Sequence, residues 1–408
     1  MSMRFLAGVI SAFYNPLKVP NAPTIGTATG GDAEATVSFT APADVGGGAI
    51  TGYGAAAVKT SDGTTATTTG AASPLTVTGL TNGSAYTMNV WALNSFGPSP
   101  FSAASGSVSP AAIRGVFAGG TTGSGYSNVI DYFNISSASN ATDFGDLTVA
   151  RPGLASCASS TRGVFASGSG SNVIDYVTIA SVGNATDFGD YIGQGASTAY
   201  FGGCNSSTRG VFGGGFSNDG VGNELTAAIK YITIASTGNT TAFGNLATAA
   251  QYLAACSSST RGVFGGGLST TVQLAAMNYV TIATTGNSVS FGNLTVARRG
   301  LAACSSATRG VFAGGTGADN FNVIDYITIA TTGAATDFGD LTSLKFNLAA
   351  CSSSTRGLFG GGSLPATSYT ATTDYITIAT TGNATGFGDL TVARLNPTAC
   401  SNGNGGVQ

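Results

Sequence analysis

Residues 304–351 read CSSATRGVFAGGTGADNFNVIDYITIATTGAATDFGDLTSLKFNLAAC, one copy of a unit that recurs six times. Each copy is marked by Arg-Gly-Val-Phe or Arg-Gly-Leu-Phe, beginning at Arg114, Arg162, Arg209, Arg261, Arg309 and Arg356. An apolar run ending in small residues is followed by a strand containing Tyr, a second strand containing Phe, and a strand ending in Cys. Four short strands in about 48 residues are the size of one propeller blade.

The order of these elements resembles kelch repeats. A Gly pair ends the first apolar strand in most copies, and a Tyr lies in the next strand: Tyr132, Tyr176, Tyr231, Tyr279, Tyr326 and Tyr375. A Phe stands where kelch repeats usually have Trp: Phe144, Phe188, Phe243, Phe291, Phe338 and Phe387. A single four-stranded sheet cannot bury both faces, so the sheets must stack. The resemblance implies an all-β fold with a six-bladed kelch-like β-propeller over residues 111–402 and a tail at 403–408.

The two ends of the repeat region predict how it closes. The chain enters at the strand Ile113–Phe117, with no Cys-containing strand before it. It ends with an unpartnered strand of that type at Leu395–Cys400. We therefore expect the last strand to complete the first blade, which removes both free sheet edges.

Residues 19–110 have a different texture, with short alternating strands between Pro-rich ends. Tyr86, six residues after Leu80, resembles the tyrosine corner of β-sandwiches. Together with Asn-Ala-Pro-Thr at 21–24, this segment resembles a fibronectin type III domain. It departs from that family at Phe39, where a Trp is common. The resemblance implies a β-sandwich that extends or orients the rest of the chain.

Residues 1–18 form an apolar arm, and its candidate anchoring side chains are Phe5, Leu6, Val9, Ile10, Phe13 and Tyr14. A signal peptide is the alternative, although only one Arg precedes the apolar run and no A-x-A cleavage site follows. The run is too short to span a bilayer. We expect the arm to dock onto another protein of an assembly.

Composition narrows the chemistry. The 408 residues include no His, only 8% are charged, and the net charge is −3. Without His there is no Ser-His-Asp triad and no His-ligated metal. We expect a protein that is not an enzyme, holds no cofactor or metal, and binds no nucleic acid, because it lacks a basic surface. No segment is long enough to predict a membrane span.

Three residue types recur with the repeat and are expected to be architectural. Six cysteines fall one per repeat: Cys157, Cys204, Cys256, Cys304, Cys351 and Cys400. We expect reduced, buried thiols, since packed sheets lie too far apart for disulfides; a metal-binding ring is the alternative. The repeated Arg is expected to bond turn carbonyls or the Asp of Asp-Phe-Gly-Asp. Asp precedes the Tyr in four repeats, at Asp131, Asp175, Asp325 and Asp374.

Variation between the repeats suggests where a ligand would bind. The turns after the first and third strands hardly change, whereas the other two connections differ every time. Alternate connections of a blade emerge on one face, and loops on a rigid scaffold often carry binding residues. Free drift of solvated loops is the alternative. The candidate ligand residues are Tyr126, Tyr191, Tyr200, Phe216, Asn218, Asp219, Glu224, Asp319, Asn320, Phe321 and Tyr369. Aromatic, Asn and Asp side chains suit sugars.

An apolar arm, a fibronectin-like domain and near-identical, charge-poor repeats together resemble bacteriophage virion accessory proteins of the tail-fibre or capsid-decoration type. This resemblance implies a structural and adhesive protein of the virion. It would be assembled in the host cytoplasm, held to other virion proteins by the arm as part of a symmetric assembly, and would face host-surface polysaccharide. A bacterial surface or filament adhesin and a decoration protein without a ligand are the alternatives.

Overall fold

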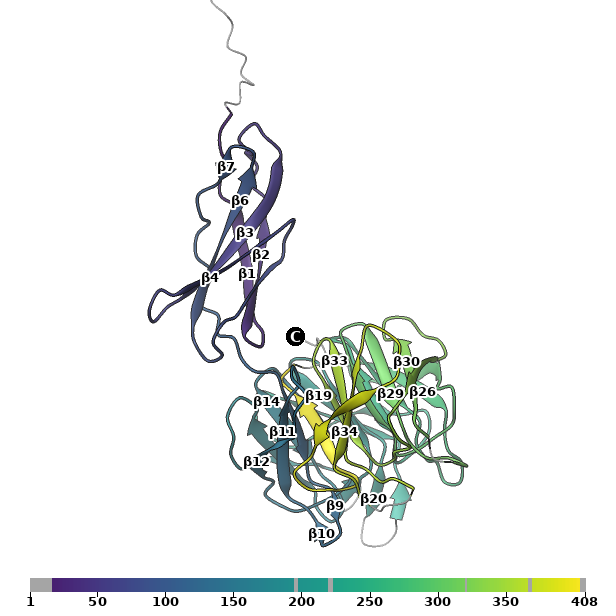
Figure 1. Cartoon of the computed structure of the whole chain (residues 1–408). Helices are drawn as coiled ribbons and strands as arrows, with labels where there is room; N and C mark the ends of the chain where they lie inside the picture. Colours follow the sequence, from purple (N-terminus) through teal and green to yellow (C-terminus); the bar gives the residue numbers. More distant parts are fainter. Residues whose placement is uncertain (1–16, 194–196, 219–222, 320, 366–368, 404–408) are drawn as a thin grey trace, which may run out of the picture. The chain divides into compact units, whose positions relative to one another are not determined.

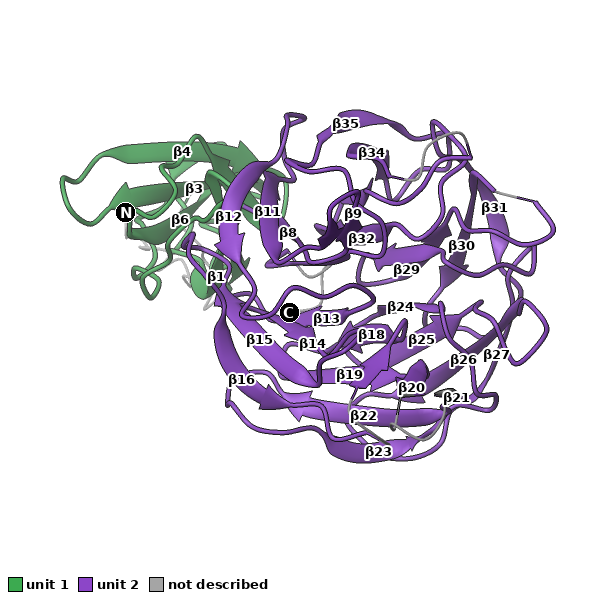
Figure 2. Ribbon diagram, turned by 90° about the horizontal axis from the view of Figure 1, so that it is seen from below, with its two compact units in different colours: residues 1–112 green, residues 113–408 purple. Residues whose placement is uncertain are grey.

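A computed structural model describes residues 17–193, 197–218, 223–319, 321–365 and 369–403 (Figure 1). These residues form strands, turns and irregular segments, and none of them is helical. The chain divides into two compact units, Met1–Ala112 and Ile113–Gln408, coloured separately in Figure 2. The anchoring side chains predicted in the arm, at positions 5 to 14, lie outside the described residues.

Unit 1 consists of two antiparallel sheets. One has the order β1-β2-β5, with β1 (Thr24–Gly30), β2 (Glu34–Thr40) and β5 (Leu75–Thr78). The other has the order β4-β3-β6-β7, with β3 (Ile50–Lys59), β4 (Thr65–Gly70), β6 (Tyr86–Asn94) and β7 (Gly97–Pro98). Alternate residues of β2 and β6 are buried, which is the pattern of strands with one face against a core.

The tyrosine corner predicted in unit 1 is present. The Tyr86 hydroxyl accepts a hydrogen bond from the backbone N–H of Thr81 at 3.0 Å, and its ring is buried beside Leu80 in the core. Phe39 takes the core position that a Trp often fills, with its ring centroid 4.9 Å from that of Tyr53. Trp91 instead packs against Phe101 in an edge-to-face arrangement.

Unit 2 contains six four-stranded antiparallel sheets, one for each repeat. The first contains β36 (Thr398–Ser401), β8 (Arg114–Ala118), β11 (Val129–Asn134) and β12 (Thr142–Asp146). The second contains β13 (Ala155–Ala158), β14 (Arg162–Ala166), β15 (Val173–Thr178) and β16 (Thr186–Asp190). The third contains β18 (Gly202–Asn205), β19 (Arg209–Gly213), β22 (Ala228–Thr233) and β23 (Thr241–Asn245).

The last three sheets repeat this order without interruption. The fourth contains β24 (Ala254–Ser257), β25 (Arg261–Gly265), β26 (Ala276–Thr281) and β27 (Val289–Asn293). The fifth contains β28 (Ala302–Ser305), β29 (Arg309–Ala313), β30 (Val323–Thr328) and β31 (Thr336–Asp340). The sixth contains β32 (Ala349–Ser352), β33 (Arg356–Gly360), β34 (Thr372–Thr377) and β35 (Thr385–Asp389).

In each sheet the Cys-containing strand lies toward the centre of unit 2. The last strand of the sheet, such as β16 or β27, lies toward its rim (Figure 2). Each inner strand contacts the inner strand of the next sheet, and β36 contacts both β32 and β13. The C-terminal strand β36 pairs with β8 of the first repeat, with Cys400 opposite Val116. The apolar clusters between sheets draw on neighbouring repeats: Phe144 and Phe165, for example, share one cluster.

The repeated Arg side chains join neighbouring sheets. Each guanidinium lies over the Tyr ring of its own repeat, at 4.2 to 4.7 Å from the ring centroid. Each also donates a hydrogen bond of 2.8 to 3.0 Å to a carbonyl of the next repeat, and Arg356 donates to Ile135 of the first. Two partners are expected for this Arg, and the observed one is the turn carbonyl. The carbonyl lies directly after the third strand of the next sheet, and this contact accounts for the constant sequence of the turn there.

The Asp that precedes the Tyr in four repeats is buried and paired with a cation from the connection before its sheet. The four buried ion pairs have N–O distances of 2.8 to 3.0 Å and join Arg151 to Asp175, Arg298 to Asp325, Lys345 to Asp374, and Arg394 to Asp131. A Thr hydroxyl also donates to each carboxylate, as Thr148 does to Asp175 at 2.6 Å. Buried charges require such partners, so these residues are architectural.

Two sheet interfaces lack the pair, and there both members are replaced together. The third repeat has Lys230 and the fourth has Asn278 in place of Asp. The cation position, six residues before the Cys, then holds Thr198 and Ala250, respectively. In both interfaces, therefore, the cation of the pair is absent wherever its Asp is absent.

The cysteines fill the space left by the Gly of Arg-Gly. A Cβ built on Gly357 would lie 2.6 Å from Sγ of Cys304 in the preceding sheet, and the same relation holds at the other five interfaces. All six thiols are free and buried, as expected from their equivalent positions. Each Cys–Gly contact lets an inner strand lie close to the second strand of the next sheet.

This packing predicts the effect of Gly357→Ala. The added methyl group must displace Cys304, so we expect the free energy of unfolding to fall by about 1–3 kcal/mol. Gly386→Ala in β35 is the matched control, because nothing lies within 4 Å of the added Cβ. Thermal and urea unfolding would compare Gly357→Ala with this control. The wild-type chain, Gly357→Ala, Cys304→Ala and the double variant form a double-mutant cycle. Additive losses in that cycle would contradict the proposed clash.

Candidate functional site

A ring of six residues in the left-handed conformation surrounds the centre of unit 2. They occupy equivalent places, four residues before each Cys, with φ between +52° and +71°: Gly153, Tyr200, Tyr252, Gly300, Asn347 and Asn396. The backbone N–H of each donates to the carbonyl of the preceding member at 2.6 to 3.1 Å, and Gly153 donates to Asn396. We call these residues the axial ring.

The ring is uneven in its side chains. Gly and Asn adopt positive φ readily, but a Tyr there costs about 1–2 kcal/mol because its Cβ crowds the following carbonyl oxygen. Of six non-Gly residues with positive φ in the described structure, four belong to the axial ring. Strain is therefore concentrated here, and Tyr200 and Tyr252 carry the most costly part of it.

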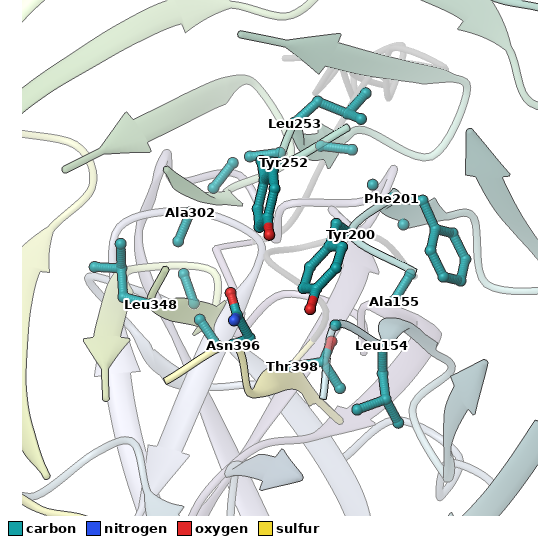
Figure 3. A pocket seen from close by; sticks show the side chains of 18 of the residues that line it. Leu154, Ala155, Tyr200, Phe201, Tyr252, Leu253, Ala302, Leu348, Asn396 and Thr398 are labelled. Carbon is teal, nitrogen blue, oxygen red and sulfur yellow. The ribbon is translucent and has the colours of Figure 1, made fainter. Parts of the chain in front are cut away.

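The two tyrosines stack on each other, with ring centroids 4.3 Å apart (Figure 3). Tyr200 lies against Gly153, where a Cβ would come within 2.7 Å of the Tyr200 ring. Ser169 donates a hydrogen bond of 3.3 Å to the Tyr200 hydroxyl. Burial, followed by the neighbouring Tyr200, raises the pKa of the Tyr252 hydroxyl, which therefore stays a neutral hydrogen-bonding group.

The axial ring forms the mouth of a pocket of about 130 Å³. Figure 3 shows Tyr200, Tyr252 and Asn396 around its opening, with the amide of Asn396 facing the two phenol rings. Deeper in, the wall consists of small residues from the inner strands, such as Ala255 and Ala303. No residue that lines the pocket is charged.

The variable connections lie at the same end of unit 2 as this mouth, because the ring residues themselves belong to them. Each connection into a sheet hydrogen-bonds the connection between the second and third strands of that sheet. In the third repeat these segments form β17 (Ser197–Ala199), β20 (Phe216–Asn218) and β21 (Asn223–Leu225). In Figure 1, β20, β9 (Thr121–Thr122) and β10 (Gly125–Tyr126) lie at the same end of unit 2. Single bridges such as Gln251 to Leu268 join the segments elsewhere.

The predicted ligand residues are distributed unevenly over this end. Tyr126, which pairs with Thr121 in the β9–β10 hairpin, is 58% exposed, and Glu224 and Asp319 are exposed. Phe216, Phe321 and Tyr369 are half-buried. Tyr200 alone among the candidates belongs to the axial ring. Asp219 and Asn320 lie outside the described residues, as does the side chain of Asn218.

Tyr191 is misplaced among the candidates. It stands where the other repeats have Leu, as at Leu147, and only 3% of it is exposed. Its ring packs against Phe201 and Phe212 in the core between two sheets. Burial raises the pKa of its hydroxyl well above the ordinary value. A buried side chain of this kind contacts no ligand, and its place after Asp-Phe-Gly-Asp is the signal that it is a core residue.

Tyr252, Asn347 and Asn396 are not among the residues predicted from the variable loops. Each lies four residues before a Cys, and this spacing is visible in the sequence. Because the residue type at this position differs between repeats, the spacing alone does not indicate a role for the side chain. Only the ring of backbone hydrogen bonds places these three side chains and that of Tyr200 around one opening.

The thiols offer little reactivity. Burial raises the pKa of Cys204, Cys304 and Cys400 to about 12 and that of the other three well above the ordinary value. A buried thiol that does not ionise is a poor nucleophile and metal ligand. Among the residues described here, no group of three or more His, Cys, Asp or Glu is placed to hold a metal ion.

Comparison with known proteins identifies one part of the chain. Residues 21–107 match the family model of the fibronectin type III domain, so the chain carries such a domain near its N-terminus. No curated protein matches the chain. Within the described ranges, no helix is long and apolar enough to cross a membrane.

Proposed function

We propose that unit 2 is a closed six-bladed β-propeller of the kelch type. Three contacts that join the last repeat to the first support this proposal. β36 pairs with β8, Arg356 donates to the carbonyl of Ile135, and Arg394 pairs with Asp131. Radial sheets with the Cys-containing strands innermost are the arrangement that such blades require.

Ending the chain at Thr391 tests this closure. The truncation removes β36 and Arg394, so β8 gains a free edge and Asp131 loses its cation. We expect unit 2 to lose its cooperative thermal transition, measured by circular dichroism at 217 nm. A chain ending at Gly403 is the matched control and should melt as the full chain does. An unchanged melting curve for the shorter chain would rule out the closed ring.

We further propose that the protein is a non-catalytic adhesion protein that binds surface polysaccharide through the end of unit 2 with the variable connections. One observation carries this proposal: every variable connection hydrogen-bonds another variable connection, so they form one surface held by rigid sheets. The exposed Tyr126 and the neutral polar mouth suit sugars, which are bound by aromatic contact and hydrogen bonds. Specific binding residues are commonly placed on such loops.

The setting that we propose for this adhesion is a bacteriophage particle. The charge-poor repeats and the fibronectin type III domain support a protein built for assembly and display rather than for catalysis. Residues 1–18 would attach the chain to other virion proteins. Cryo-electron microscopy of a particle carrying the chain would place it on the head or the tail.

A polysaccharide panel tests the adhesive function. We expect the full chain to retain at least one bacterial surface polysaccharide in biolayer interferometry, and Tyr126→Ala and Tyr369→Ala to weaken retention about tenfold or less each. Phe101→Ala, an exposed aromatic of unit 1, is the control and should bind normally. Absence of binding to every polysaccharide of the host envelope would leave decoration without a ligand as the better account.

A further inference from the structure

We propose that the mouth of the axial ring binds one neutral sugar ring, the terminal residue of a glycan. This inference rests on the proposed function and deepens it, because it assigns a particular place and ligand class on that end of unit 2. The site consists of the phenol groups of Tyr200 and Tyr252 and the amides of Asn347 and Asn396.

Backbone strain is the first argument. Gly153 and Gly300 show that the ring accepts glycine without strain. The backbone hydrogen bonds are the same in all six repeats, so the ring itself requires no side chain at these places. Residues with a strained backbone cluster at ligand sites, because the strain persists only where the surrounding structure holds it in place. The two tyrosines therefore point to a role for their side chains in the mouth.

The arrangement of the four side chains is the second argument. Around the ring, Tyr200 and Tyr252 are neighbours, and Asn347 and Asn396 are neighbours on the opposite half. The two glycines separate the halves: the Tyr200 ring lies against Gly153, and the amide of Asn347 lies against Gly300. A bound ring would meet phenol groups on one side and amide groups on the other. Such a set donates and accepts hydrogen bonds as sugar hydroxyls require.

Charge and size select the ligand class. No residue that lines the pocket is charged, so a carboxylate or phosphate inside it would have no ion-pair partner in the wall. The guanidinium of Arg299 lies outside the lining, 5.9 Å from the centroid of the Tyr252 ring. The pocket volume of about 130 Å³ is well below the 300–1,000 Å³ typical of drug-sized ligands, which suits one sugar ring rather than several. The small residues of the inner strands form the wall below the mouth.

The test replaces ring side chains by glycine, which the ring already has at Gly153 and Gly300. Tyr252→Gly and Asn396→Gly remove one side chain each and keep a residue that adopts positive φ, as in two of the six repeats. Saturation-transfer NMR on the full chain would use methyl glycosides of glucose, galactose, mannose and N-acetylglucosamine, with methyl glucuronide as the charged comparison. Phe101→Ala is the control variant, and melting temperatures would report folding.

We expect at least one neutral glycoside to bind, methyl glucuronide not to bind, and both ring variants to lose affinity tenfold or more at an unchanged or higher melting temperature. Glycoside binding that is equal in the wild-type chain and both variants would overturn the axial site. Polysaccharide retention that needs Tyr126 but survives both ring substitutions, with no glycoside bound, would overturn it while the adhesive function stands. If the chain bound neither polysaccharide nor glycoside, both proposals would fall.

Discussion

Raising the pH from about 8.5 to 10 is expected to unfold unit 2. Each of the six buried thiols has a pKa above its unfolded value, so stability from the neutral thiol is complete below about 8.5 and declines as the pH rises toward the folded pKa, about 12 for Cys204, Cys304 and Cys400. In this window each thiol lowers the free energy of unfolding by about 1.4 kcal/mol per pH unit. Six thiols together give about 8 kcal/mol per unit, comparable to the stability of a whole domain.

The measurement is urea unfolding followed by circular dichroism between pH 7.5 and 10, with a reductant present. The slope of stability against pH counts the buried thiols, so replacing three of the six cysteines by Ala should halve it. Thiolate absorbance at 240 nm provides an independent check. Native thiols that ionise below pH 9 would contradict the expected burial.

Arg151→Ala is expected to destabilise unit 2 by about 3–5 kcal/mol, because it leaves the carboxylate of Asp175 buried without its cation. The chain offers the matched rescue. The interface between the third and fourth repeats has Ala250 and Asn278 at these two places. Arg151→Ala combined with Asp175→Asn should therefore recover part of the loss, since no buried charge remains. The four backbone carbonyls to which Arg151 donates still lose that donor.

Asp175→Asn alone should also be strongly destabilising, because the guanidinium of Arg151 then lacks its counter-ion. Chemical unfolding of the wild-type chain, both single variants and the double variant gives the coupling energy directly. A double variant as unstable as the sum of the single variants would show that the pair is not the source of the effect.

Most of the fold follows from the repeat itself. Four strands per repeat, their order, and the unpartnered strand at Leu395–Cys400 are read from the sequence, because hydrophobic periodicity and turn residues act locally. The tyrosine corner at Tyr86 is equally local, since its hydroxyl reaches a backbone N–H only five residues away. Tyr191 shows the limit of this reasoning: its place in a variable connection predicts exposure, whereas its equivalence to Leu147 decides its burial.

Contacts between repeats are harder to predict, even where the signal is present. The cation six residues before the Cys is absent in the same two interfaces that lack the Asp, and this paired change marks an ion pair. The paired change becomes visible only when the cation position and the Asp position are compared together across all six repeats. One repeat read alone does not show it. Arg298 and Asp325 are 27 residues apart, so no local rule joins them.

The sequence by itself determined the number of repeats, the strands in each and the fibronectin type III domain, because these depend on short-range pattern. The tertiary structure decided which side chains meet at the centre. Tyr200, Tyr252, Asn347 and Asn396 are spread over nearly 200 residues and share only a spacing from a cysteine. They surround one opening because a ring of backbone hydrogen bonds holds six left-handed residues together, and a sequence pattern cannot report that geometry.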